Sequence, residues 1–224
     1  MTTTYKVIIK NDTGDANTSR VYVVYSEFPG VSGGGIASAL RTQWAKSKGL
    51  VNQGQDVFRY TSESFGFAGY CNASTSSSMT SGTEITLVAS NSVTIGSFRN
   101  DGSSLYVSEN NDAIGIKDTG SSTSNNGTFT ISTDAKIPSP STYVVGLARK
   151  SERDGISPVA VVECKPGADF VFTPSPAIYI ARGNQGDGVI LSSIGTYGRV
   201  EFRGNSKEAI VSETANGTFS VVYK

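Results

Sequence analysis

Short runs of apolar and β-branched residues, each ending at Gly, Asn, Asp, Ser or Pro, recur along the whole chain. At the start, Tyr5, Val7 and Ile9 occupy every second position, and the turn-forming sequence 11–14 follows. A period of two places such side chains on one face of a β-strand. With this strand at 5–10, the same signature predicts strands at residues 20–26, 57–61, 84–89, 92–98, 104–108, 113–117, 128–132, 143–148, 159–164, 169–173, 177–182, 189–192, 199–203, 208–212 and 218–223.

The number of predicted strands is too large for one sheet, because a single open sheet leaves long edges and one unburied face. We therefore expect an all-β fold: a two-sheet sandwich, or a jelly-roll or barrel-like domain. Single all-β domains reach the 224 residues of this chain. Residues 1–224 are thus predicted to form one β-sandwich domain whose core needs neither disulfide nor metal.

One segment departs from the period of two. In residues 36–48 apolar side chains, including Leu40 and Trp44, recur at helical spacing, and Gly49 follows as a helix terminator. We expect one short helix there, crossing an end of the sandwich. The polar stretches 72–82 and 118–127 are predicted to be long exposed loops.

Charge limits the range of partners. The 19 basic and 19 acidic residues balance, and no cluster of Lys and Arg suggests a phosphate-binding face, so nucleic acid is not an expected partner. Zero net charge also makes self-association into a homo-oligomer easier.

The sequence predicts a soluble, cytoplasmic protein with no membrane partner. Residues 1–6 lack the basic and apolar regions of a leader, and no stretch approaches the roughly 18 apolar residues of a membrane span. Without a leader, Cys71 and Cys164 are expected to be buried thiols rather than a disulfide.

The chain contains no histidine. This excludes Ser-His-Asp and Cys-His nucleophilic arrangements and the usual imidazole ligands of metals. We therefore predict no catalytic residues, no metal site and no cofactor. A pair of carboxylates can still support hydrolysis, but the acidic residues show no characteristic spacing.

Aromatic and turn residues are the remaining candidates for a binding site. Sugar sites and apolar pockets use aromatic faces together with Asn, Asp and backbone groups. Each candidate also has a simpler explanation, since aromatic residues fill cores and Asn and Asp form turns. The candidate ligand-binding residues are Trp44, Phe65, Phe67, Tyr70, Asn184, Asp187 and Tyr197.

The segments 5–14 (YKVIIKNDTG), 21–29 (VYVVYSEFP) and 127–131 (GTFTI) resemble a group of leaderless, uncharacterised fungal β-rich proteins. That group is similar to fungal cytosolic lectins in size, strand content and the absence of a leader. The resemblance implies an all-β cytoplasmic protein and supplies no catalytic residues. A likeness of fold alone does not establish function.

Three functions follow as hypotheses. The first is a non-catalytic binding protein, either lectin-like with a carbohydrate ligand or holding a small apolar molecule. The second is a self-assembling structural or storage protein, and the third is a histidine-independent enzyme that uses carboxylates.

Overall fold

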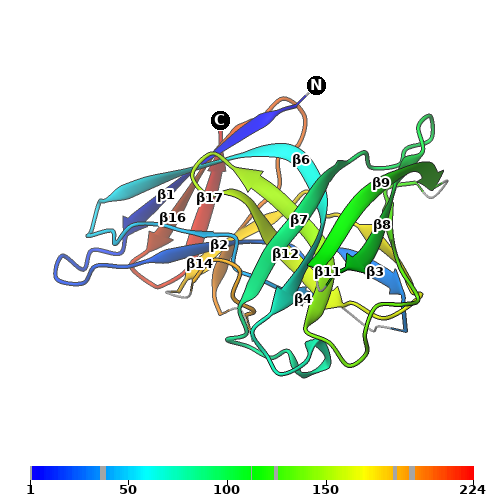
Figure 1. The fold of residues 1–224 in the computed structure, drawn as a ribbon. Coiled ribbons are helices and arrows are strands. Elements are labelled where there is room, and N and C mark those ends of the chain that lie inside the picture. The colour runs from blue at the N-terminus through cyan, green and yellow to red at the C-terminus, as the bar shows by residue number, and fades with distance from the viewer. Residues whose placement is uncertain (1, 36–38, 112, 124–125, 184–185, 192–194) are drawn as a thin grey trace.

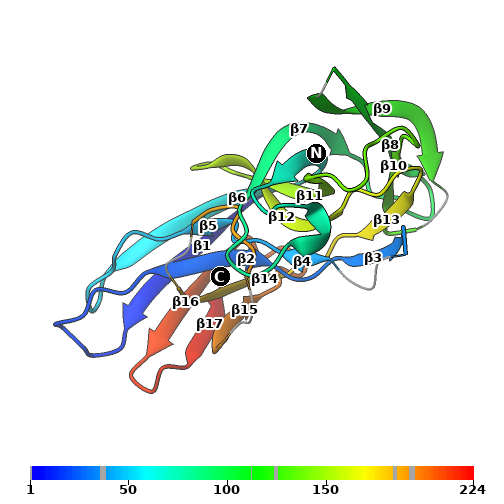
Figure 2. The same cartoon turned by 60° about the horizontal axis from the view of Figure 1, so that its bottom comes forward.

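A computed structural model describes residues 2–35, 39–111, 113–123, 126–183, 186–191 and 195–224. The described chain is built almost entirely from β-strands, which form three sheets of eight, five and four strands. Figures 1 and 2 both show β1, β16 and β17 at one end of the molecule and β8 and β9 at the other.

The eight-stranded sheet runs the length of the molecule, in the order β17-β16-β1-β6-β11-β12-β4, with β7 also paired to β6. All its neighbours are antiparallel except β1 and β16, which are parallel. Its strands are β17 (Phe219–Tyr223), β16 (Glu208–Thr214), β1 (Thr4–Asp12), β6 (Gln55–Cys71), β11 (Tyr143–Ser151), β12 (Gly155–Glu163), β4 (Leu40–Arg41) and β7 (Ile85–Val93).

The two smaller sheets cover different halves of this long sheet. The four-stranded sheet has the order β15-β14-β2-β5, and the five-stranded sheet has the order β3-β13-β10-β8-β9. The strands of the first are β15 (Tyr197–Val200), β14 (Ile178–Arg182), β2 (Tyr22–Ser26) and β5 (Ala45–Lys46). The strands of the second are β3 (Gly30–Gly33), β13 (Asp169–Thr173), β10 (Phe129–Thr133), β8 (Gly102–Asn110) and β9 (Ala113–Thr123).

The 17 residues of β6 connect two lobes. In the first lobe, residues 55–61 of β6 pair with β1 and the four-stranded sheet packs opposite. In the second lobe, residues 64–71 pair with β7 and the five-stranded sheet packs opposite. Gly66 allows this approach, because a Cβ there would lie 2.3 Å from Leu105 Cδ1. One cluster of buried apolar residues includes members of both lobes.

The prediction of an all-β, sandwich-like fold is confirmed, and most predicted strands are present within a few residues of their expected ends. The runs at 92–98 and 189–192 are exceptions. The run at 92–98 is not a separate strand, because β7 continues from Ile85 to Val93 and its ladder with β6 ends there. Val189 and Ile190 form only isolated bridges, and residue 192 lies outside the described residues. The polar stretch 118–127 was predicted to be a loop, but β9 continues through it to Thr123. A β-ladder to β8 satisfies this polar backbone.

The predicted helix at 36–48 is wrong where the structure describes it; residues 36–38 lie outside the described part. The segment crosses from β12 to β2, and its amides bond to those strands. Thr42 donates to the carbonyl of Val159 and Trp44 to that of Val24. Trp44 is fully buried between the sheets. Helical spacing of apolar residues arises here because almost every side chain of the crossing is buried.

The two cysteines lie in separate buried clusters. Cys164 belongs to the main core and Cys71 to a smaller cluster on the other face of the long sheet. Both are free thiols with 2% exposure. No helix in the described ranges is long and apolar enough to cross a membrane.

Candidate functional site

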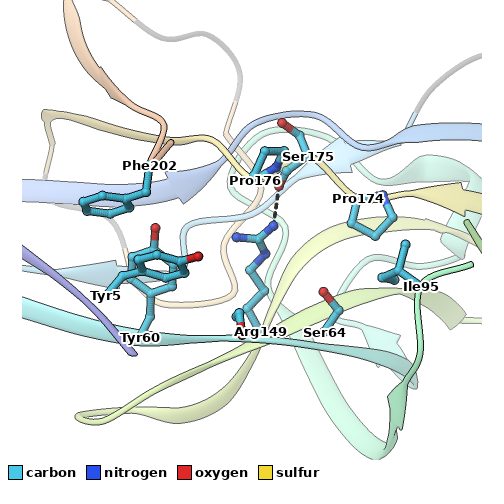
Figure 3. Close-up of a pocket in the computed structure, with 10 residues that line it drawn as sticks. Tyr5, Tyr60, Ser64, Ile95, Arg149, Pro174, Ser175, Pro176 and Phe202 are labelled. Carbon is cyan, nitrogen blue, oxygen red and sulfur yellow. Dashed lines mark hydrogen bonds between the residues drawn. The ribbon is translucent and has the colours of Figure 1, made fainter. Parts of the chain in front are cut away.

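A cavity of about 180 Å³ opens where β6 passes from one lobe to the other (Figure 3). β1 contributes Tyr5, β6 contributes Tyr60, Ser62 and Ser64, and β11 contributes Arg149. The segment 174–176, which connects the five-stranded sheet to the four-stranded sheet, closes another side. The cavity therefore lies between the eight-stranded sheet and the segment that connects the two smaller sheets.

An irregularity in the β6–β11 ladder shapes the floor of the cavity. Arg149 faces Ser64 in the ladder, but Ser151 already faces Tyr60, so β6 uses four residue steps where β11 uses two. The ladder of β6 with β1 ends at Thr61, and its ladder with β7 begins only at Ser64. Extra residues in one strand bend it and redirect side chains, and such bulges are frequent beside binding sites.

Arg149 is the charged group of the cavity. Its side chain continues the inward face of β11 from Val145 and Leu147, and only 7% of the residue is exposed. Nη2 donates a hydrogen bond to the carbonyl of Ser175, whereas Nε is buried without a partner. Among the described residues, no carboxylate forms an ion pair with Arg149. A buried arginine normally has such a partner.

Burial lowers the pKa of Arg149 from its ordinary value. The ordinary value is so far above neutrality that the guanidinium remains charged at pH 7. The centroid of the Trp44 ring is 5.9 Å from Cζ, close to the limit of a cation–π contact. The cavity therefore holds one positive charge that the protein neutralises only weakly.

Arg41 provides an informative contrast. It is also buried and forms no ion pair with the described carboxylates. However, its guanidinium lies 3.8 Å from the ring centroid of Phe28 and within 5.4 Å of those of Tyr25 and Tyr179. Aromatic faces therefore surround the charge of Arg41, and no such set of rings surrounds Arg149.

The partner of Arg149 is held firmly in place. Ser175 lies between Pro174 and Pro176, which restrict the backbone on both sides. The hydroxyl of Ser175 donates to Glu27 at 2.5 Å, and Arg199 Nε donates to the same carboxylate at 3.1 Å. Hydrogen bonds from Arg199 are the main reason why the pKa of Glu27 falls to about 2. Glu27 is therefore already neutralised by Arg199 and reaches Arg149 only through Ser175.

Aromatic rings form the wall on one side of the guanidinium. The rings of Tyr5 and Phe202 stack at 4.8 Å with planes 10° apart, and the ring of Tyr60 lies 5.3 Å from that of Tyr5. Burial raises the pKa of Tyr60, so its hydroxyl stays protonated at neutral pH. Figure 3 shows this wall on one side of Arg149 and Ile95 on the other.

Among the described residues, the lining of the cavity contains no Asp, Glu, Cys or Lys. Its serine hydroxyls therefore have no neighbouring base among the lining residues that could activate them. Within the described ranges, His, Cys, Asp and Glu form no group of three or more that could hold a metal ion. The guanidinium of Arg149 and the neighbouring serine hydroxyls can donate hydrogen bonds to an anion.

None of the described residues that the sequence predicted as ligand-binding lines this cavity. Trp44 lies directly behind it, with its ring 5.1 Å from that of Tyr60 in a T-shaped contact. Phe65 and Phe67 share one face of β6, but that face packs into the smaller buried cluster. These three aromatic residues fill cores in the structure.

The other predicted residues lie apart from one another. Tyr70 is 44% exposed near the end of β6, and Tyr197 is 44% exposed on β15. Asp187 accepts a hydrogen bond from Gln43 at 3.0 Å, as a residue that orders a turn would. Asn184 lies outside the described residues. The structure does not bring this set together into one site.

Arg149 was missed because the predicted strand ended at Ala148, one residue before it. The alternation of apolar residues along this strand indicated that Arg149 would be buried. Val145, Leu147 and Arg149 fall on one face of β11, and both apolar members are fully buried. An arginine in phase with core positions is a candidate for a buried charge.

A family model described as RhiA matches residues 2–224, nearly the whole chain. The chain therefore belongs to the RhiA family. No curated protein and no solved structure matches it.

Proposed function

We propose that this RhiA-family chain is a non-catalytic binding protein that holds a small anionic molecule in the cavity around Arg149. The observation that carries the proposal is a buried guanidinium without a carboxylate partner among the described residues, directed into a cavity between the eight-stranded sheet and the segment 174–176. An anion that enters the cavity gains charge-assisted hydrogen bonds in a partly water-excluded place.

The lining supports binding rather than turnover, because its described residues include no carboxylate, thiol or imidazole. This favours the first of the three hypotheses over an enzyme that uses carboxylates. The aromatic wall also agrees with an apolar part of the ligand. A second hollow, of about 240 Å³ beside Arg182 and Glu213, is a weaker candidate, because those two charges already pair with each other.

The test uses a panel of probes of similar size: benzoate, phenyl phosphate, benzenesulfonate and the neutral benzyl alcohol. Trp44, the only tryptophan in the sequence, lies behind the cavity, so its fluorescence reports occupancy and calorimetry gives the affinity. We expect at least one anion to bind at least tenfold more tightly than benzyl alcohol. Replacement of the charge in Arg149→Met should abolish that preference.

Arg59→Met is the matched control. Arg59 lies next to Tyr60 on β6, but its side chain is 45% exposed and faces Glu152 at 3.9 Å, away from the cavity. This variant removes the same charge and should keep the affinity of the native chain. The proposal is wrong if every anion binds as weakly as benzyl alcohol, or if both variants reduce the affinity equally.

A further inference from the structure

The cavity offers one positive charge and several neutral donors, and this restricts which anion it suits. Arg149 is the only Lys or Arg among the described residues that line it. A phosphate monoester carries close to two negative charges at neutral pH, and a single guanidinium balances only one of them. The charge of the site therefore matches a monoanion.

The geometry of the guanidinium selects further among monoanions. Nη2 already donates to Ser175, and Nε is enclosed without a partner. The end of the guanidinium formed by Nη1 and Nη2 is therefore the part available to a ligand. Two parallel N–H groups match the two oxygens of a carboxylate in a bidentate pair. Ser62 and Ser64 line the same cavity and supply hydroxyls for the remaining lone pairs of such a ligand.

The size and walls of the cavity define the rest of the ligand. A volume of about 180 Å³ is below the range of about 300–1,000 Å³ that is usual for drug-sized ligands. The rings of Tyr5 and Phe202 are nearly parallel, and Ile95 and Pro174 lie on the opposite side of Arg149 (Figure 3). Apolar surfaces on both sides of a charged centre favour a small, flat, apolar group.

We infer that the ligand is a small aromatic monocarboxylate, whose carboxylate pairs with Arg149 and whose single ring packs against the wall formed by Tyr5, Tyr60 and Phe202. This inference rests on the proposed function, because it specifies the anion that the same cavity holds. It names a chemical class, and benzoate is the simplest probe of that class.

The experiment compares benzoate, phenyl phosphate, acetate and benzyl alcohol by calorimetry on the full native chain at pH 7. A hydrogen bond to a charged group is worth roughly 1.5–3 kcal/mol, so benzoate should bind about 10- to 100-fold more tightly than benzyl alcohol. Benzoate should also bind more tightly than phenyl phosphate, because the site has no second cation for the second phosphate charge. It should bind more tightly than acetate, because acetate has no ring.

The variant Arg149→Lys tests whether benzoate needs the two parallel N–H donors of a guanidinium or only a positive charge. Lysine keeps the positive charge but cannot form the bidentate pair. Benzoate should therefore lose most of its advantage over benzyl alcohol in this variant, although the net charge of the site is unchanged. If Arg149→Lys fails to fold, the comparison of ligands on the native chain still decides the matter.

Each alternative outcome has a distinct meaning. If phenyl phosphate binds as tightly as benzoate, the inference that the ligand is a carboxylate is wrong, and the proposed anion-binding function still holds. If acetate binds as tightly as benzoate, the inference that the ligand carries an aromatic ring is wrong. If no anion exceeds benzyl alcohol, this inference and the proposed function fail together.

Discussion

Glu213 joins the two sheets of the first lobe, and its replacement by glutamine should destabilise the protein strongly. Its carboxylate on β16 is 1% exposed. It accepts hydrogen bonds from Tyr22 at 2.8 Å and from Arg20 at 3.0 Å, and it pairs with Arg182 on the four-stranded sheet. Burial alone would raise the pKa of Glu213, but the bonds from Tyr22 and Arg182 outweigh it and lower the pKa. The group is therefore an ionised, buried connector.

Glu213→Gln keeps the shape of the side chain and removes its charge. Breaking a buried ion pair costs about 3–5 kcal/mol. Arg182 is 54% exposed and can be solvated, so we take the lower end, about 3 kcal/mol. For a chain of this size, that change lowers Tm by roughly 6–12 °C.

The assay is urea unfolding followed by circular dichroism, with thermal unfolding as a second measurement. Glu152→Gln is the control, because its carboxylate is 56% exposed and 3.9 Å from Arg59. Loss of this exposed ion pair in Glu152→Gln should change the free energy of unfolding by less than about 0.5 kcal/mol. A loss below about 1 kcal/mol for Glu213→Gln would refute the reasoning that this carboxylate fastens the two sheets.

Three further predictions concern other parts of the fold. The pKa of Glu27 is lowered from 4.5 to about 2, chiefly by Arg199, so its stabilisation is present above pH 4.5 and is lost as the pH falls through 2. In urea titrations from pH 7 to pH 2.5, Glu27→Gln should reduce the loss in acid by about 1–2 kcal/mol after solvent screening. A Cβ on Gly146 would lie 2.1 Å from a carbonyl oxygen of β12, so Gly146→Ala should cost about 2 kcal/mol or more in urea unfolding, whereas Gly195→Ala, which meets nothing within 4 Å, should not. Burial raises the pKa of Cys164 to about 12, and a thiol reagent at pH 8 should modify it only after denaturant is added.

The strands could be predicted because each has a local signature. In β1, residues Val7 and Ile9 alternate along the strand and are buried against the opposite sheet. In β10, Phe129 and Ile131 do the same. Period-two alternation reports burial on one face directly, whatever the strand order. The pairing of distant strands, such as parallel β1 and β16, has no comparable local signal.

The length of β6 could not be predicted, because it depends on contacts with neighbouring strands and has no local signature. The predicted strand stopped at Thr61, whereas β6 continues through Gly66 and Gly69 to Cys71. In the structure these glycines allow close approach within one long strand: a Cβ on Gly69 would lie 2.1 Å from the carbonyl oxygen of Thr86. The requirement comes from neighbouring strands, and it is invisible in the local sequence. The cavity depends on this strand, so its position was equally hidden.

The burial of Arg149 without an ionic partner predicts that this residue lowers the stability of the protein while it supports binding of an anion. A buried charge without an ionic partner carries a desolvation cost that a methionine of similar length would not. Arg149→Met loses one hydrogen bond from a charged donor to Ser175, worth roughly 1.5–3 kcal/mol, but it relieves the larger desolvation cost of several kcal/mol. We therefore expect the variant to gain about 1–2 kcal/mol in urea unfolding at pH 7 while losing its affinity for anions. A loss of stability greater than about 1 kcal/mol would mean that Arg149 serves the fold, and the case for a ligand as its missing partner would lose its physical basis.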